Sequence, residues 1–239
     1  MLNSLYDEAI EETWKTFDQV ARNYRRKPWS IVYKVLEDHI ELFGDIGSGP
    51  GHNALAILEV LKGSRGVVVD ISFNMVYQAM RRAYRRGFSW RLLAIEADMT
   101  HLPFKDGVFD LLIYIASIHH LSSKKLRIKA LEEAYRVLKN KGKLLITVWA
   151  RYQLYFISKI VSNLIKKLIG RKQSIGDIFI PWIHKGIKLR RYYYLYTLKE
   201  LRKDLEEAGF KILDLGVFYP VKKYLKPTKN YYAISLKSG

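Results

Sequence analysis

The chain contains no cysteine, which excludes a disulfide framework and any zinc site built from thiolates. It also has no apolar run long enough to cross a bilayer, and its first residues lack the basic and apolar regions of a secretory signal. Acidic residues are few, since 23 Asp and Glu face 41 Lys and Arg, and the net charge is +18. From these absences we expect a cytoplasmic protein without a membrane partner.

The positive charge is concentrated toward the C-terminus. Residues 151–239 hold 19 Lys and Arg against 6 Asp and Glu, a net charge of +13, whereas residues 1–150 carry +5. A surface of one sign attracts polyanions and favours phosphate binding, so nucleic acid is one interpretation. The other is that the charge only keeps the protein soluble. Glutamine is scarce as well as cysteine, a composition that hints at a thermophile.

An apolar run from Leu42 leads into the turn Asp45-Ile46-Gly47-Ser48-Gly49-Pro50-Gly51, and an amphipathic segment begins at Asn53. Glycine permits positive φ and leaves no Cβ between the backbone and a ligand, and the helix N-terminus behind it offers free N–H groups. Two later apolar runs also end near an acid, at Asp70 and at Asp98. Doubly wound folds grip a ribose with such an acid, although each could instead cap the next helix.

Strands and helices alternate as far as Trp149, which predicts an α/β, doubly wound fold with a mostly parallel sheet. We expect four segments: an N-terminal helical cap (1–41) with a second helix from Ser30 to about Glu41, a ligand-binding core (42–150), a basic and aromatic insertion (151–192), and a C-terminal helix and strand hairpin (193–239). The insertion is expected to be α-helical, through a basic helix near residues 153–169. This helix would cover the active site; docking to an anionic membrane is the alternative.

The pattern Asp-x-Gly-x-Gly-x-Gly from Asp45, with Asp98 after the third strand, resembles the class I S-adenosylmethionine (SAM) methyltransferases, whose sheet has seven strands. The glycines alone would also suit a dinucleotide. The resemblance implies that Asp45 lies near the SAM amino group, that Asp70 holds the ribose hydroxyls and that Asp98 accepts from the adenine amine. SAM is thus the expected cofactor and S-adenosylhomocysteine its product, bound also by Gly47, Gly49, Gly51, Met99 and Ala116.

Further stretches resemble the tRNA wobble-uridine carboxyl methyltransferases, which esterify the carboxylate of 5-carboxymethyluridine at anticodon position 34. They are Arg25-Arg26-Lys27-Pro28-Trp29, Ile118-His119-His120, Pro181-Trp182, Arg191-Tyr192-Tyr193 and Asn230-Tyr231-Tyr232. The set covers nearly the whole chain. It departs from the family at Leu121, where an aromatic residue often follows the two histidines.

The resemblance implies that Arg25 clamps the acceptor carboxylate and that His119 and His120 face the acceptor. A carboxylate is already ionised at neutral pH, so positioning and charge recognition, rather than a strong base, would support the reaction. Without the resemblance, adjacent histidines would suggest a loop cap and a solvated ring, and a tyrosine run would suggest core. The residues expected to bind the substrate are Lys27, Trp29, Trp182, Arg191 and Tyr192.

By the same resemblance, the anticodon loop of tRNA is the expected partner, together with a small zinc-binding activator protein such as eukaryotic members use. No zinc ligand set occurs in this chain, and we expect no bound metal. Two other functions stay open. One is a small-molecule SAM-dependent methyltransferase acting on quinone or lipid precursors, which leaves the basic insertion without a role. The other is a SAM- or RNA-binding subunit without catalysis.

Overall fold

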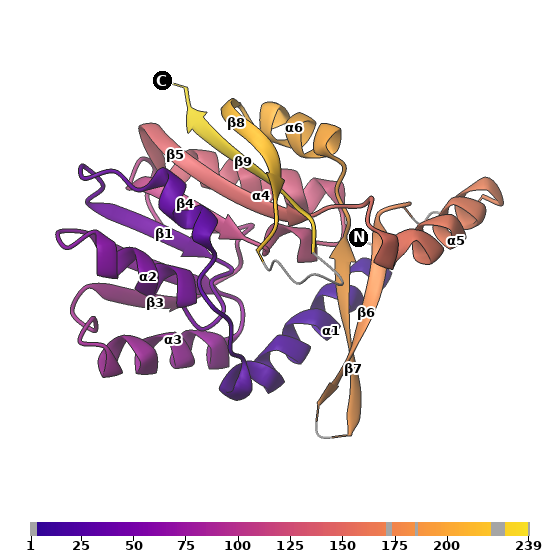
Figure 1. Cartoon of the computed structure of the whole chain (residues 1–239), viewed down its shortest axis with the longest axis horizontal. Coiled ribbons are helices and arrows are strands. Elements are labelled where there is room, and N and C mark those ends of the chain that lie inside the picture. The colour runs from indigo at the N-terminus through magenta and orange to yellow at the C-terminus, as the bar shows by residue number, and fades with distance from the viewer. Residues whose placement is uncertain (1–3, 171–173, 185, 221–227, 239) are drawn as a thin grey trace.

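A seven-stranded sheet with the order β3-β2-β1-β4-β5-β9-β8 forms the centre of the computed structural model, which describes residues 4–170, 174–184, 186–220 and 228–238 (Figure 1). Strands β1 to β5 are mutually parallel, and β9 runs antiparallel to both of its neighbours. This confirms the predicted doubly wound, mostly parallel fold. The strands are β1 (Leu42–Ile46), β2 (Arg65–Asp70), β3 (Leu92–Glu96), β4 (Phe109–Ile115), β5 (Leu138–Trp149), β8 (Phe210–Phe218) and β9 (Asn230–Lys237).

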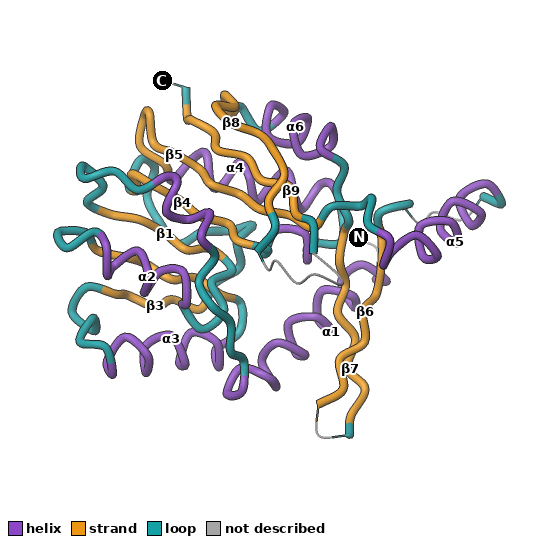
Figure 2. The backbone as a smooth tube through the Cα atoms, viewed as in Figure 1, coloured by secondary structure: helices purple, strands orange, loops and turns teal. Residues whose placement is uncertain are grey.

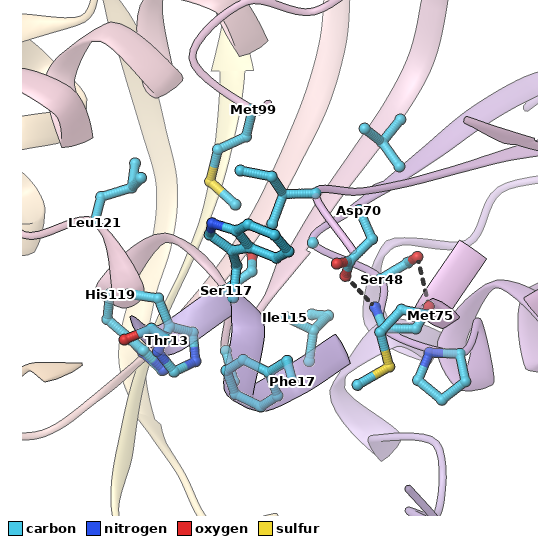
Figure 3. Close-up of a pocket in the computed structure, with 18 of the residues that line it drawn as sticks. Thr13, Phe17, Ser48, Asp70, Met75, Met99, Ile115, Ser117, His119 and Leu121 are labelled. Carbon is cyan, nitrogen blue, oxygen red and sulfur yellow. Dashed lines mark hydrogen bonds between the residues drawn. The ribbon is translucent and has the colours of Figure 1, made fainter. Parts of the chain in front are cut away.

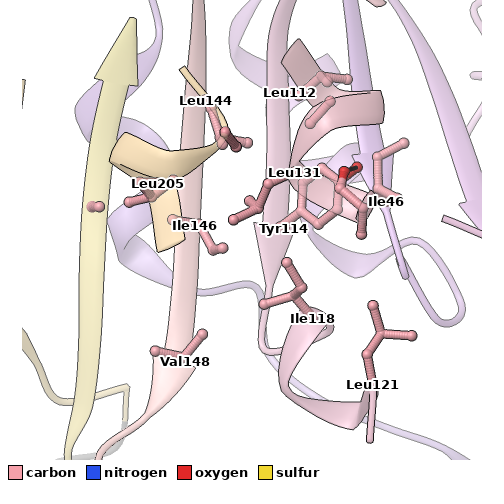
Figure 4. Packing of buried hydrophobic residues seen from close by; sticks show 14 of the residues in the cluster. Ile46, Leu112, Tyr114, Ile118, Leu121, Leu131, Leu144, Ile146, Val148 and Leu205 are labelled. Atoms are coloured by element: carbon pink, nitrogen blue, oxygen red, sulfur yellow. Dashed lines mark hydrogen bonds between the residues drawn. The ribbon is translucent and has the colours of Figure 1, made fainter. Parts of the chain in front are cut away.

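Helices cover both faces of the sheet, which explains why its central strands are apolar almost throughout. On one face, α4 (Lys124–Val137) and α6 (Leu198–Glu207) pack Leu131 and Leu205 against β4 and β5 (Figure 4). On the other face, α2 (His52–Val60) and α3 (Phe73–Arg85) pack against β1 and β2. Each fully buried leucine of this kind stabilises the fold by roughly 2 kcal/mol.

Helix α1 (Ser4–Val20) bridges the core and the insertion. Its Asp18 accepts hydrogen bonds from the Ser72 hydroxyl and from the backbone and side-chain amides of Asn74, at the start of α3. On the side of the insertion, the Thr16 hydroxyl of α1 donates to the carbonyl of Arg190. The helix is thereby held between α3 and the insertion (Figure 1).

The helix predicted from Ser30 to Glu41 is wrong, because only a 3-10 helix from Ser30 to Val35 forms there. Three β-branched residues in this segment, Ile31, Val32 and Val35, are buried against the sheet. Restricted χ1 angles make such residues poor α-helix formers. Backbone extension at Leu36 then ends the 3-10 helix.

The insertion combines a helix with a strand pair that the sequence pattern did not predict (Figure 2). The expected basic helix is present as α5 (Ile157–Leu168). After it, β6 (Asp177–His184) and β7 (Ile187–Tyr194) form a separate two-stranded antiparallel sheet, and β7 runs two residues past the expected boundary at residue 192. None of the helices that the structure describes has the length and apolar character needed to cross a membrane.

Candidate functional site

A cavity of about 590 Å³ opens at the carboxyl ends of the central parallel strands, beneath α1 (Figure 3). One half of its wall comes from the turns after β1, β2, β3 and β4. The other half comes from α1, the segment 24–29, the histidines after β4, and β7. The strand order reverses between β1 and β4, and open α/β sheets bind their ligands at such a switch point.

The glycine turn has the backbone conformation that its sequence predicted. Gly47 and Gly49 lie in the wall with φ of 66° and 53°. A Cβ at Gly47 would lie 2.4 Å from the Cβ of Ser117, whereas the space beside Gly49 is open apart from the Met75 sulfur at 3.8 Å. Gly51 is not in the wall; a Cβ there would meet Ala79 of α3 at 3.1 Å. The third glycine therefore allows close helix packing rather than ligand approach.

Two of the three predicted acids reach the cavity. The carboxylate of Asp70 accepts hydrogen bonds from the backbone N–H groups of Gly49 (2.8 Å) and Ser72 (3.0 Å), and burial raises its pKa to about 6. Asp98 lies in the wall and accepts from the N–H of Thr100 at 2.8 Å. Both carboxylates are thus placed to accept further hydrogen bonds from hydroxyl or amine groups of a ligand.

Asp45 lies beneath the turn and outside the cavity wall. One carboxylate oxygen accepts from the N–H of Ala54 at 3.2 Å in the first turn of α2, and the other has no partner among the described residues. Burial raises its pKa to about 7. Asp45 therefore supports the turn from behind, and the structure does not bring it against a ligand directly.

The remaining residues predicted at the cofactor, Met99 and Ala116, also line the cavity. Ala116 has a φ of 54°, an uncommon value for a residue with a Cβ. Such strain is often found at binding sites. Four further polar or sulfur-bearing wall residues are not among those predicted, although Ser48 lies inside the glycine turn and Ser117 directly follows Ala116: Ser48, Asn53, Met75 and Ser117.

Both histidines after β4 lie in the wall, and both are neutral. His119 is fully buried, and its Nδ1 accepts from the backbone N–H of Trp149 at 3.2 Å, so the proton is on Nε2. This Nε2 has no partner in the described part of the chain. His120 donates from Nδ1 to the carbonyl of Tyr192 at 2.9 Å. Burial holds the pKa of His119 well below its usual range and lowers that of His120 to about 3.

The guanidinium at the cavity comes from Arg26, not from the predicted Arg25. Arg26 lines the wall, lies 5.1 Å from the Tyr24 ring centre, and has no carboxylate within ion-pairing distance among the described residues. Arg25 is exposed, as Arg26 is, but it lies outside the wall. The predicted Lys27 and Trp29 do line the cavity.

Strand alternation separates the residues of β7 into two faces. Tyr193 lines the cavity and stacks on Trp149 at 4.3 Å between ring centres. The predicted Tyr192 points the other way, into the core, where its hydroxyl donates to Asp177 at 2.7 Å. Tyr193 therefore takes the wall position that the sequence analysis gave to its neighbour.

Arg191 and Trp182 lie together outside the wall residues. The Arg191 guanidinium is 4.2 Å from the Trp182 ring centre, and its buried Nε has no partner among the described residues. Burial lowers the pKa of Arg191, and the nearby charge of Arg26 lowers it further. Two guanidinium groups thus lie near one another at one end of the site without a counter-charge in the described part of the chain.

The two halves of the cavity suit two different ligands. The first offers open backbone and carboxylates, which fits a ligand with hydroxyl and amine groups. The second offers cations, an N–H donor and aromatic faces, which fits a planar ring carrying an anionic group. Helix α5 contributes no wall residue, so the covering role predicted for it falls to α1 and the hairpin. The described residues contain no group of three or more side chains that could ligate a metal.

Comparison with known proteins identifies methyltransferases, with relatives of two kinds. Residues 44–146 match a family model described as a methyltransferase domain. Over 231 residues the chain is 27% identical to the tRNA (carboxymethyluridine(34)-5-O)-methyltransferase of Schizosaccharomyces pombe, covering 86% of this chain and 91% of that one. Over 211 residues it is 31% identical to the ubiquinone/menaquinone biosynthesis C-methyltransferase UbiE of Rhizobium etli, covering 88% and 72%. A SAM-dependent methyltransferase from Methanosarcina mazei has the same fold, with a TM-score of 0.74 at 19% identity over 89% of this chain and 99% of that one.

Proposed function

The chain belongs to the class I SAM-dependent methyltransferases, and from this premise we propose that it methylates the carboxylate of 5-carboxymethyluridine at wobble position 34 of tRNA. The observation that carries the proposal is the second half of the cavity. There the Arg26 guanidinium, which has no counter-charge within the described part of the chain, and the buried Nε2–H of His119 face the acceptor space. His119 and His120 are both poor bases.

The first half of the cavity fits SAM, which supplies the electrophilic methyl group when bound. We assign the ribose hydroxyls to Asp70 and the adenine amine to Asp98, because both carboxylates line the wall with free acceptor capacity. Gly47 and Gly49 leave their backbone open to the methionine end. Asp45 acts indirectly, through the N-terminus of α2 that carries the turn.

A carboxylate acceptor explains the absence of a suitable base among the acceptor-side histidines. Its oxygen is ionised at neutral pH, so it could take the methyl group from the sulfonium sulfur without losing a proton, and S-adenosylhomocysteine would leave as a neutral thioether. The protein then has to orient the anion and lower its desolvation cost. We assign this to the Arg26 guanidinium and to the Nε2–H of His119, with Tyr193 as a stacking surface for the uracil ring.

A cationic surface beside the cavity supports RNA as the carrier of the acceptor. Arg25, Arg85 and Arg86 lie close enough to Arg82 for their charges to lower its pKa. Arg82 in turn donates to the carbonyl of Tyr24, in the segment that lines the cavity. Arginines clustered at a pocket entrance would bind the phosphates that flank an inserted base.

A small zinc-binding activator remains part of this proposal. Strand β3 is an edge of the sheet, and Trp90 and Leu93 near it are exposed. An unpaired apolar edge is a natural place for a second protein to pair. The similarity to UbiE keeps a small-molecule acceptor as the competing function, for which the uncompensated Arg26 has no evident use.

The test is transfer of radiolabelled methyl from SAM to tRNA that carries carboxymethyluridine at position 34, with and without a candidate activator. Mild alkali should then release the label as methanol, because methyl esters hydrolyse and N-, C- and ether-linked methyl groups do not. Label that survives alkali would keep tRNA as the substrate and reject the carboxylate. Transfer only to a quinone precursor would establish the competing function.

A further inference from the structure

Helix α5 turns an apolar face toward solvent, the reverse of an ordinary surface helix. Residues spaced i, i+4, i+7 and i+11 share one side of a helix. Here that side carries aliphatic side chains whose exposed fractions range from 45% to 78%. We call this set the α5 patch: Ile157, Val161, Leu164, Ile165, Leu168 and Ile169.

Polar contacts hold α5 in this orientation. Asn163 is buried on the opposite side, and its side-chain amide donates to the carbonyl of Asp177 at 2.5 Å. The Lys159 ammonium donates to the carbonyl of Phe179 at 2.9 Å. Both acceptors belong to β6, so the helix is tied to the hairpin by its polar side while the α5 patch faces away.

The patch has no function in the methyl-transfer site. No α5 residue lines the cavity, and α5 extends away from the body of the molecule, where a flat surface could meet it without touching the sheet (Figure 1). Exposed apolar patches of this kind mark sites of association with another molecule or with a membrane.

Charge indicates which kind of surface meets the patch. The sequence has no Asp or Glu between Glu133 and Asp177. Besides Lys159, which is bonded to the hairpin, α5 carries Lys166 and Lys167. An apolar helix face accompanied by lysines and by no acids is typical of helices that lie in the plane of an anionic lipid interface, where the lysine stems extend toward the headgroups. A second copy of this chain, with its net charge of +18, is repelled at this face, and RNA phosphates gain nothing from an aliphatic patch.

We propose that α5 docks the protein on an anionic lipid bilayer, with the α5 patch inserted at the boundary between headgroups and acyl chains. The association is peripheral and leaves the cavity accessible. It is independent of the acceptor proposed above, because neither the patch nor its lysines belong to the cavity wall.

The absence of cysteine permits a direct test, since one introduced thiol can carry a unique label. An environment-sensitive dye is attached to the full chain at Leu168→Cys, and as a matched control at Leu213→Cys, whose leucine is 50% exposed on β8. Each protein is mixed with vesicles of phosphatidylcholine alone or with added phosphatidylglycerol. A blue shift at position 168, only with phosphatidylglycerol, and none at position 213 is the expected result.

Vesicle sedimentation with unlabelled variants separates apolar insertion from net charge. Leu164→Glu and Leu168→Glu should each weaken binding to the anionic vesicles by roughly tenfold or more, whereas Leu213→Glu should leave it within about twofold. Equal binding by all variants would mean that net charge alone, without insertion of the α5 patch, causes binding to the vesicles, and would overturn the proposal. So would absence of wild-type binding to the anionic vesicles, or a concentration-dependent dimer that Leu168→Glu abolishes.

Discussion

At the scale of single residues, the arginines of the protein differ in whether a carboxylate partner lies beside them. Arg151, for example, is buried but bonded to Glu200, whereas Arg26 and Arg191 have no carboxylate within ion-pairing distance in the described part of the chain. Keeping the buried Arg191 guanidinium without a counter-charge is costly, whereas Arg26 is exposed and keeps its hydration until an anion binds. An anionic acceptor that arrives during the reaction would supply the missing partner.

Arg26→Ala should lower kcat/KM for the tRNA acceptor by roughly tenfold to hundredfold, the usual loss for a charge-assisted hydrogen bond. SAM affinity, measured by calorimetry, should be unchanged. Arg25→Ala is the comparison, since it removes the same charge one residue away and outside the wall, so it should lose only the smaller contribution of a phosphate contact. A greater loss of activity in Arg25→Ala than in Arg26→Ala would reject this assignment of the clamp.

Gly49→Ala should weaken SAM binding at least tenfold while the protein still folds, because its added Cβ would enter open space beside the ligand. Gly107 is a matched control, with a similar φ of 66° and nothing within 4 Å of a Cβ. Both substitutions should cost about 1 kcal/mol of stability from the left-handed backbone. If calorimetry finds equal SAM affinities in the two variants, Gly49 does not contact the ligand.

The burial of Asp70 makes SAM binding depend on pH. Its pKa is raised to about 6, and only the ionised carboxylate accepts from both ribose hydroxyls. As pH falls through 6 the group takes up a proton, so the Kd for SAM should rise, by at most about tenfold per pH unit. Asp70→Asn should bind weakly at pH 7 and lose this dependence, whereas Asp45→Asn should retain it. If the Kd for SAM depends on pH in Asp70→Asn as it does in the wild type, a group other than Asp70 causes the pH dependence.

At the scale of elements, the sequence predicts best those strands and helices in which each face meets the same kind of environment along its whole length. The central strands β1, β2 and β4 and the second half of β5 are buried on both faces, so their apolar runs are unambiguous. The hairpin was missed because neither strand alternates cleanly between apolar and polar residues: β6 is apolar or aromatic at most positions, and β7 joins basic residues to three consecutive tyrosines. One face of the hairpin meets the cavity and α1, and the other meets the core. Without the hairpin, the sequence does not show that Tyr193, rather than the predicted Tyr192, faces the cavity.

The choice between Arg25 and Arg26 had a different cause. The segment after the 3-10 helix at Ala21–Asn23 is extended and irregular, and no period assigns its side chains to a face. Only the tertiary contacts decide the matter, through the Arg26 N–H bonded to His52 and the Arg26 guanidinium beside Tyr24. The glycine turn, by contrast, was predictable because glycine is the residue type that adopts positive φ without steric cost.

Asp18 fixes α1 over the cavity, so Asp18→Ala should loosen that cover. We expect a loss of about 1–2 kcal/mol in stability, from the lost hydrogen bonds at the start of α3, and a larger KM for the acceptor. Limited proteolysis should cut within α1 faster in this variant, because α1 is released from α3. Lys15→Ala, which breaks an exposed ion pair on the same helix, should change none of these quantities. Equal behaviour of the two variants would mean that α1 is held by other contacts.

At the scale of the whole molecule, we propose different partners for three surfaces. The cavity beneath α1 takes SAM and the acceptor, the arginines near Arg82 flank its entrance, and the α5 patch lies outside it. A net charge of +18 brings polyanions to all of them and therefore does not by itself select one. Selection of the acceptor must come from the groups inside the cavity.

The most direct measurement compares methyl transfer to two tRNAs that differ only at position 34, one with carboxymethyluridine and one with the corresponding amide, carbamoylmethyluridine. The two side chains have nearly the same shape, and only the first is an anion. Our expectation is rapid transfer to the carboxylate and none to the amide. Equal transfer to both, or transfer to neither while a quinone precursor is methylated, would contradict it.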